Sequence, residues 1–201
     1  IYRHSPFTKL KYTLINDDVS YQDYNRMYRY NPDGNLKRYR YGLTQLLQLN
    51  HTFSTKTFLN VGFTHFKKSY QHRTYDRDKW NQYVHPKLLN SQPYSFLTGG
   101  TDLSVFSRET NTSTFKADLT SQWNSKNKIK LGIEFRQHQL NFNDYSLRPP
   151  DEKASFNELS DDPFLGNPQR FPDSTIYSST YNFKPIEFSA YVQDKIELNE
   201  L

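Results

Sequence analysis

Strict alternation of apolar and polar residues is the feature that most constrains how this chain can fold. It is clearest at residues 128–138, where every second residue from Ile129 to Phe135 is apolar and Lys, Gly or Glu lies between. Successive side chains of a β-strand point to opposite faces, so the pattern predicts a strand with one apolar and one charged face. Residues 115–123 alternate similarly, and a short segment that includes residues 125–127 separates the two runs. Together they predict a hairpin with a tight turn.

Other segments repeat this arrangement. Residues 43–53 alternate, a short Ser-Thr-Lys segment follows, and the alternation resumes at residues 59–64. A third run, residues 186–193, leads to a turn-like sequence at residues 197–200, and residues 7–14 alternate more weakly. Each unit predicts a strand, a short polar turn and a returning strand, and the first two units lie roughly 70 residues apart.

Long polar stretches separate the predicted hairpins, at about residues 67–103 and 141–184, and they hold most of the Pro and Asp residues. A Pro-Asp-Gly turn signal at residues 32–34 lies between two Tyr-rich runs. Loops of this length are uncommon in a compact soluble domain. Short turns on one side and long loops on the other are typical of an outer-membrane β-barrel, in which the short turns are periplasmic.

The composition also favours a sheet with one wet face. Only 34% of the residues are hydrophobic, a value that alone would favour disorder, but 16% are aromatic, and aromatic residues drive burial. A transmembrane barrel reconciles the two values, because its outer band is apolar while its lumen and loops are polar. No apolar run approaches the roughly 18–20 residues of a membrane helix.

The charge pattern argues against nucleic-acid binding. The formal net charge of +5 comes from 26 basic residues dispersed among 21 acidic ones, without a basic patch. Anionic lipopolysaccharide is the partner that better fits basic loops. Cysteine is absent, so the fold needs neither a disulfide nor a thiolate metal site. The chain begins at Ile1 without a signal sequence, so we expect a secretory signal to lie upstream.

Motifs of catalysis are absent from the sequence. Nucleophile-elbow, phosphate-loop and dinucleotide-binding patterns are all missing, so we predict no enzyme, no catalytic residue and no cofactor. The histidines lack the spacing of a metal site, and we interpret each as a structural or surface residue. The five histidines considered are His51, His65, His72, His85 and His138.

One group of candidate residues carries charge on the predicted wet face of the clearest hairpin. It comprises Lys116, Asp118, Lys130, Glu134 and Arg136. A turn centred on Lys126 would place Lys116 diagonal to Glu134, within reach for cross-strand pairing. The same turn would place Asp118 diagonal to Arg136. We interpret these residues as lumen-facing wall charges, and a substrate path is the alternative.

A second group consists of aromatic residues in the long polar stretches. Rings in exposed loops can stack on sugars or other ring-bearing ligands, although such loops also pack on themselves. The candidate ligand-binding residues are Trp80, Tyr83, Tyr94, Tyr177 and Tyr181. A further set, Phe53, Phe58, Trp123 and Tyr191, flanks the short turns, where a barrel places an aromatic girdle.

Three segments resemble barrel strands of TonB-dependent outer-membrane receptors of the Bacteroidetes type. They are residues 43–60, 115–136 and 184–195. The resemblance implies that residues 1–201 are an antiparallel, up-and-down segment of a transmembrane β-barrel, about six or seven strands of a larger barrel. It also implies one fragment of a barrel domain, with no internal domain boundary, without the receptor's plug domain and without its energy-coupling box.

The function implied by this resemblance is that of a wall and extracellular-loop segment of a receptor in the bacterial outer membrane. Such a receptor takes up a scarce solute actively, for example a ferric siderophore, cobalamin, a glycan or a peptide. Its partners would be outer-membrane lipid and lipopolysaccharide, its own plug and remaining strands, and TonB through the plug. The alternative is a surface β-sandwich that binds glycans, or an adhesin. A sandwich packs two apolar faces together, whereas a barrel exposes one apolar band to lipid.

Overall fold

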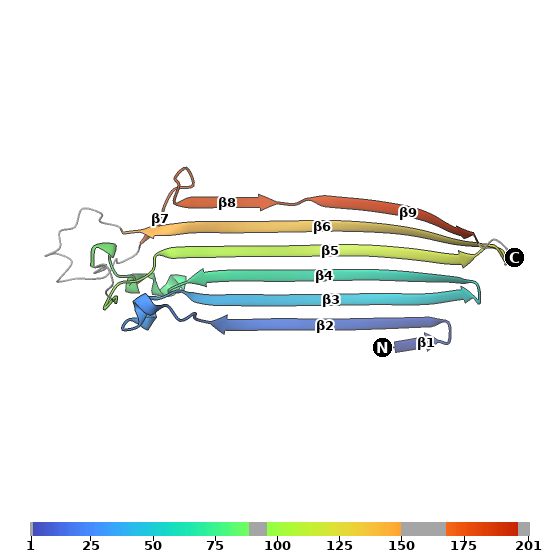
Figure 1. Ribbon diagram of the computed structural model, residues 1–201, viewed down its shortest axis with the longest axis horizontal. Coiled ribbons are helices and arrows are strands. Elements are labelled where there is room, and N and C mark those ends of the chain that lie inside the picture. The colour runs from blue at the N-terminus through green and yellow to red at the C-terminus, as the bar shows by residue number, and fades with distance from the viewer. Residues whose placement is uncertain (1, 89–95, 150–167, 197–201) are drawn as a thin grey trace.

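The computed structural model describes residues 2–88, 96–149 and 168–196, which form one antiparallel sheet with short 3-10 helices in the loops (Figure 1). The strands are β1 (Tyr2–Ser5), β2 (Thr8–Tyr21), β3 (Lys37–Ser54), β4 (Thr57–Arg73), β5 (Ser104–Gln122), β6 (Asn127–Arg148), β7 (Gln169–Arg170), β8 (Ser178–Phe183) and β9 (Ile186–Ile196). The helices are η1 (Arg26–Tyr28), η2 (Pro32–Gly34), η3 (Arg77–Gln82) and η4 (Pro86–Leu88). None of these helices has the length and apolar character needed to cross a membrane.

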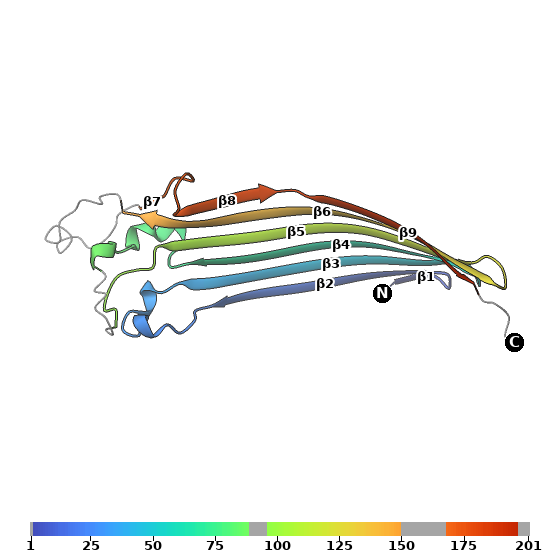
Figure 2. The same ribbon diagram turned by 45° about the horizontal axis from the view of Figure 1, so that its top comes forward.

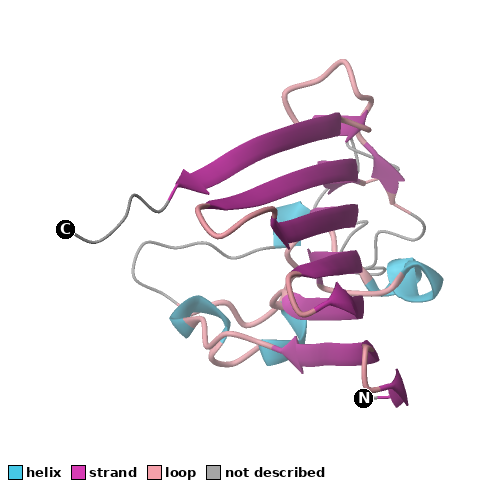
Figure 3. Ribbon diagram, turned by 90° about the vertical axis from the view of Figure 1, so that its right-hand side faces the viewer, coloured by secondary structure: helices cyan, strands magenta, loops and turns pink. Residues whose placement is uncertain are grey.

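The strands follow an up-and-down order. From β1 to β6, strands adjacent in the chain are adjacent in the sheet, and every pair is antiparallel. β9 pairs with the first half of β6 and β8 with its second half, so the two share one strand position at that edge. Seen end-on, the described strands make one open layer whose two edges do not meet (Figure 3). The predicted all-β, up-and-down sheet is confirmed, and closure into a barrel stays a prediction.

Tight turns lie at one end of the sheet and the longer loops at the other (Figures 1 and 2). All three tight turns use a side-chain oxygen that accepts a hydrogen bond from the backbone N–H two residues later, a common turn chemistry of Ser and Asn. Ser5 Oγ accepts from Phe7 at 3.2 Å, and Ser54 Oγ accepts from Lys56 at 3.2 Å. Asn124 Oδ1 accepts from Lys126 at 2.8 Å.

The strands are longer than the sequence predicted. β4 continues to Arg73, β6 continues to Arg148, and β8 begins at Ser178, so parts of both stretches predicted as loops are strand. β2 likewise extends to Tyr21, well beyond the weakly alternating residues 7–14. The predicted turn at residues 197–200 lies outside the described residues.

Register defines two faces of the sheet, because residues directly opposite one another on neighbouring strands share a face. We call the face with Leu131 the apolar face and the face with Lys130 the charged face. Leu119 lies opposite Leu131, and Asp118 and Glu134 lie on the charged face, as the alternation predicted. The apolar face carries a continuous apolar band in the half of the sheet nearer the tight turns. The band consists of Leu10, Tyr12, Leu47, Leu49, Leu59, Val61, Phe63, Phe115, Ala117, Leu119, Leu131, Ile133, Phe135, Phe188, Ala190 and Val192.

No other layer of the described residues covers the apolar band. Leu131 is 40% exposed and Val192 is 78% exposed, although both are large apolar residues in the middle of strands. The row of the band nearest the loops is mainly aromatic: Tyr12, Phe63, Phe115, Phe135 and Phe188 lie side by side with Leu47. The sheet therefore needs a partner on this face, such as lipid or another apolar surface.

The two faces exchange character in the half of the sheet nearer the loops. On the apolar face, Lys67 now lies beside Asn111 and Gln139, and the surface becomes polar. On the charged face, Phe142 lies opposite Tyr181, and the surface becomes aromatic. This change of phase explains why the sequence pattern failed to show the full length of the strands.

A small core fixes the loops at their end of the sheet. Tyr83 of the loop after η3 is fully buried and packs with Val105 of β5 and Leu147 of β6. Hydrogen bonds join the loop after β2 to the loop before β5. Asn31 Nδ2 donates to the carbonyl oxygen of Gly100 at 2.6 Å, and the Leu97 N–H donates to the carbonyl oxygen of Met27 at 2.7 Å.

Candidate functional site

An aromatic stripe crosses the charged face in the half of the sheet nearer the loops. It consists of Tyr70 and His72 of β4, Phe106 of β5, Phe142 of β6, and Tyr181 and Phe183 of β8. The imidazole of His72 stacks on Phe106 with ring centres 5.1 Å apart, and Phe142 stacks on Tyr181 at 4.8 Å. Phe106 meets Phe142 edge to face at 5.3 Å, so the rings form one continuous surface.

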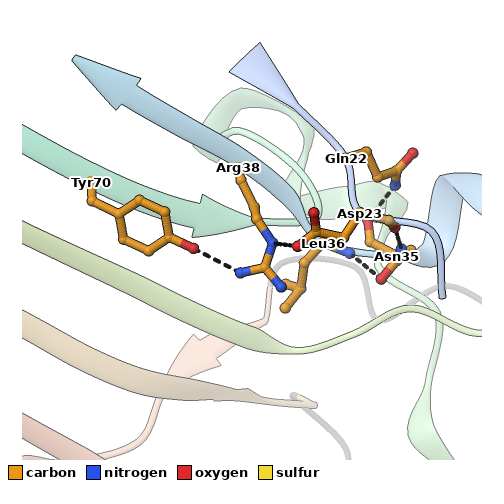
Figure 4. A network of polar contacts seen from close by, with 6 residues as sticks. All are labelled: Gln22, Asp23, Asn35, Leu36, Arg38 and Tyr70. Carbon is orange, nitrogen blue, oxygen red and sulfur yellow. Dashed lines mark hydrogen bonds and ion pairs between the residues drawn. The ribbon is translucent and has the colours of Figure 1, made fainter. Parts of the chain in front are cut away.

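A polar network ties this stripe to the loop after β2 (Figure 4). Arg38 donates from Nη1 to the hydroxyl of Tyr70 at 2.7 Å and pairs through Nε with Asp23 at 2.6 Å. Asn35 donates to the carbonyl oxygen of Asp23 at 3.0 Å, and Gln22 donates to the carbonyl oxygen of Asn35 at 3.1 Å. The position of the Tyr70 ring is therefore linked to the fold of this loop.

His72 adds little positive charge to the stripe at neutral pH. Burial lowers the pKa of its imidazole, and the nearby guanidinium of Arg38 lowers this pKa further. The carboxylates of Asp102 and Asp144 raise this pKa and so partly oppose the other two effects. The positive charge of this surface consequently comes from its Lys and Arg side chains.

Two adjoining hollows lie on the charged face beside the stripe. One, of about 330 Å³, is lined mainly by Ile15, Asp17, Arg40, Thr44, Phe66 and Lys68, and Gly42 leaves room at its floor. The other, of about 250 Å³, is lined by Lys68, Tyr70, Arg108, Thr110, Leu140, Asn141 and Tyr181. Lys68 borders both hollows. Together they offer cationic groups, hydroxyl groups and ring edges to a solute.

The predicted wall charges share one face, but their pairing differs from the prediction. Lys116 lies directly opposite Glu134, and Asp118 lies opposite a glycine rather than diagonal to Arg136. Ion pairs instead run along single strands, from Lys116 to Asp118 at 3.6 Å and from Arg136 to Glu134, and Arg136 also pairs across to Glu187 of β9 at 3.7 Å. The predicted pairing was wrong because the turn is centred on Ser125, where the Asn124 side chain caps the backbone, and not on Lys126. Lys130 lies on the same face, opposite Thr120.

The candidate aromatic residues do not form a single surface. Tyr83 is 0% exposed and has a packing role, with Trp80 packed against the same core. Tyr177 is 53% exposed in a loop and packs on Phe171. Tyr181 lies on strand β8 rather than in a loop, 41% exposed in the aromatic stripe. Tyr94 lies outside the described residues.

Two of the four residues predicted for the aromatic girdle lie on the charged face and not on the apolar face. Phe53 contacts His51 on the apolar face, and Trp123 follows the end of β5. Phe58 lies opposite Thr120 and Tyr191 opposite Gly132, so both belong to the charged face and that part of the prediction was wrong.

The histidines on the strands have ordinary structural partners. Three of them bond through Nδ1 to a hydroxyl directly across the strand pair: His51 to Thr8 at 2.8 Å, His65 to Ser113 at 3.1 Å and His138 to Thr112 at 2.9 Å. His85 is buried near the loop core. Within residues 2–88, 96–149 and 168–196, no cluster of His, Asp and Glu has the arrangement of a metal site.

On the charged face, contacts around Gly132 connect the three strands β5, β6 and β9. The ring of Tyr191 on β9 lies over Gly132 of β6, and its hydroxyl donates to Asp118 Oδ1 on β5 at 2.8 Å. A Cβ atom at residue 132 would overlap this ring. We therefore expect Gly132→Ala to lower the free energy of unfolding by about 1–3 kcal/mol, as overpacking does, in chemical denaturation of the protein in phospholipid vesicles.

Gly62→Ala is the matched control, because Gly62 is also a strand glycine on the charged face and its added Cβ would meet nothing within 4 Å. This control should be neutral or stabilising by up to about 1 kcal/mol, since alanine loses less conformational entropy than glycine on folding. Equal effects of the two substitutions would contradict the close packing of the Tyr191 ring on Gly132.

Comparison of the chain with protein-family models, curated proteins and solved structures finds no match.

Proposed function

We propose that residues 1–201 form part of the wall and the extracellular loops of an outer-membrane β-barrel. The observation that carries the proposal is the uncovered apolar band, which runs without interruption across β2, β3, β4, β5, β6 and β9. On β3 the apolar face carries Phe53 near the tight turn and Leu47 in the aromatic row, and six residues at about 3.4 Å each separate these two by about 20 Å. A barrel exposes an apolar band of about 25 Å to lipid, with aromatic residues at its rims.

The exchange of character between the two faces also supports this proposal. Barrel strands that extend beyond the lipid would have a polar outer surface, which matches the polar residues around Lys67, Asn111 and Gln139. The tight turns then lie on the periplasmic side and the loops on the extracellular side. The aromatic stripe would line the lumen near its extracellular mouth.

The receptor class rests on the resemblance of the strands to those of TonB-dependent receptors. In such a receptor the loops capture a scarce solute, which could be a ferric siderophore, cobalamin, a glycan or a peptide. The protein would act in the bacterial outer membrane, with lipid and lipopolysaccharide around the wall, and with a plug coupled to TonB inside it. The wall would provide binding and shape, and not bond chemistry.

The alternative, a glycan-binding β-sandwich or adhesin, requires a second sheet packed on the apolar band. The described strands all belong to one sheet. We therefore favour the barrel.

The behaviour of the chain in water and in detergent tests this preference. Among the described residues nothing covers the two sheet edges or the apolar band, so in water the isolated chain should be oligomeric or insoluble. In detergent micelles, sedimentation should show smaller species that retain strand structure by circular dichroism. A monodisperse monomer in water with a cooperative melting transition would contradict the barrel and favour the sandwich.

A further inference from the structure

Lys68 and Arg108 are cationic side chains without an acidic partner on the charged face. Both are exposed, and among the described residues neither forms an ion pair. Other charges nearby are compensated: Arg40 pairs with Asp17 at 3.3 Å, and Lys67, on the opposite face, pairs with Glu109 at 3.4 Å. Lys68 and Arg108 differ in this respect from their neighbours Arg40 and Lys67.

The register brings the two cations together. Lys68 of β4 lies opposite Thr110 of β5, and Arg108 is two residues from Thr110 on the same face, which makes the pair diagonal neighbours. Diagonal neighbours are about 7–8 Å apart, within reach of long side chains. Like charges at this separation repel one another, and a bound anion would remove that cost.

The immediate surroundings leave the positive charge uncompensated. The residues directly opposite Lys68 are Gly42 and Thr110, and those opposite Arg108 are Tyr70 and Phe142. The two hollows together are lined by three cationic side chains and one carboxylate, a net charge of +2. Asp144 is the diagonal neighbour of Arg108 on β6, yet no ion pair joins them among the described residues.

We propose that this surface binds a solute with at least two anionic groups, such as carboxylates, sulfates or phosphates. Lys68 and Arg108 hold the anionic groups, and Tyr70 and Tyr181 contact the less polar part of the solute. This inference deepens the proposed function and depends on it in one respect, namely that the charged face is a lumen open to solutes from the loop side. It places the binding surface on the strands, whereas the sequence placed candidate residues in the loops.

Arginine-specific labelling tests the proposal without knowledge of the natural ligand. The full chain in detergent micelles is treated with phenylglyoxal, and mass spectrometry follows the modification rate of Arg108. The probe is propane-1,2,3-tricarboxylate, and its uncharged triamide is the chemical control. Arg26, in the loop after β2, reports any general effect of the probe on arginine reactivity.

We expect the tricarboxylate to slow labelling of Arg108 about fivefold or more at saturation, while the triamide and the labelling of Arg26 show no change. Lys68→Gln should raise the concentration for half-protection about tenfold, as expected for loss of one charge-assisted contact. Lys67→Gln is the matched control, because it removes the same charge from the opposite face, and it should leave the protection unchanged.

Four results would overturn the proposal. They are no protection of Arg108, equal protection of Arg26, equal effects of Lys68→Gln and Lys67→Gln, and protection only by phosphatidylglycerol added to the micelles, which would indicate a lipid headgroup. None of these results bears on whether lipid covers the apolar band. A failure here is therefore distinguishable from a failure of the barrel proposal.

Discussion

Leu131→Arg should lower the free energy of unfolding in phospholipid vesicles by about 2–4 kcal/mol, the cost of a cation on a lipid-facing site near the middle of a membrane. Leu131 lies within the apolar band, opposite Leu119 on one side and Val192 on the other. A guanidinium there loses water without gaining a partner. Urea titration followed by tryptophan fluorescence measures the change, because the chain has two tryptophans.

Lys130→Leu is the matched control, since residue 130 is adjacent in the chain and faces the other way. The substitution removes one charge from a wet surface, and the free energy of unfolding should change by no more than about 1 kcal/mol. If Lys130→Leu proved as damaging as Leu131→Arg, the assignment of the two faces would be wrong.

Ile133→Trp separates lipid from a packed protein layer, because a soluble sandwich would also be damaged by Leu131→Arg. Ile133 has Ala117 and Ala190 directly opposite it, and a hollow of about 340 Å³ lies beside these three residues. Lipid tolerates the larger ring there. A second protein layer packed on the band would be strained by about 1–3 kcal/mol, and a loss of that size would favour the sandwich.

Tyr83→Ala should have the other large effect, a loss of about 3–5 kcal/mol in the local stability of the loops, as for deletion of a large buried aromatic side chain. The Tyr83 ring packs edge to face on Tyr75 with centres 5.2 Å apart, and its hydroxyl accepts from the Tyr75 N–H at 3.3 Å. Burial also raises the pKa of this hydroxyl. Hydrogen exchange should show lost protection in residues 74–88 with β4 and β5 still protected.

Tyr177→Ala is the control for this second prediction, because Tyr177 is a loop tyrosine that is 53% exposed. Its effect should stay within about 1 kcal/mol. Unchanged exchange in Tyr83→Ala would show that the loops do not depend on this core.

The central hairpin could be predicted from sequence because a period of two is visible in local residues. Leu119 and Leu131 share a face, and Asp118 and Glu134 share the other, as the alternation requires. The exact register could not be predicted, because it depends on how the Asn124 side chain closes the turn. A shift of the turn centre by one residue moves every cross-strand pair by two.

The extent of the strands and the aromatic stripe were missed for a related reason. Phe66 of β4 and Leu140 and Phe142 of β6 lie on the charged face, so a pattern that follows the apolar face appears to stop there. Lys68 and Arg108 are 40 positions apart in the chain, and only the pairing of β4 with β5 makes them neighbours. Burial of Tyr83 likewise depends on contacts between a loop and strand ends.

Single-cysteine accessibility shows directly whether lipid covers the apolar band. The chain has no cysteine, so each variant carries one reporter thiol. In vesicles, a water-soluble maleimide should label Lys130→Cys and Glu134→Cys but not Leu131→Cys or Ile133→Cys. It should also label Gln139→Cys, which lies on the apolar face beyond the band. Labelling of Leu131→Cys and Ile133→Cys at the rates of their charged-face neighbours would contradict the account.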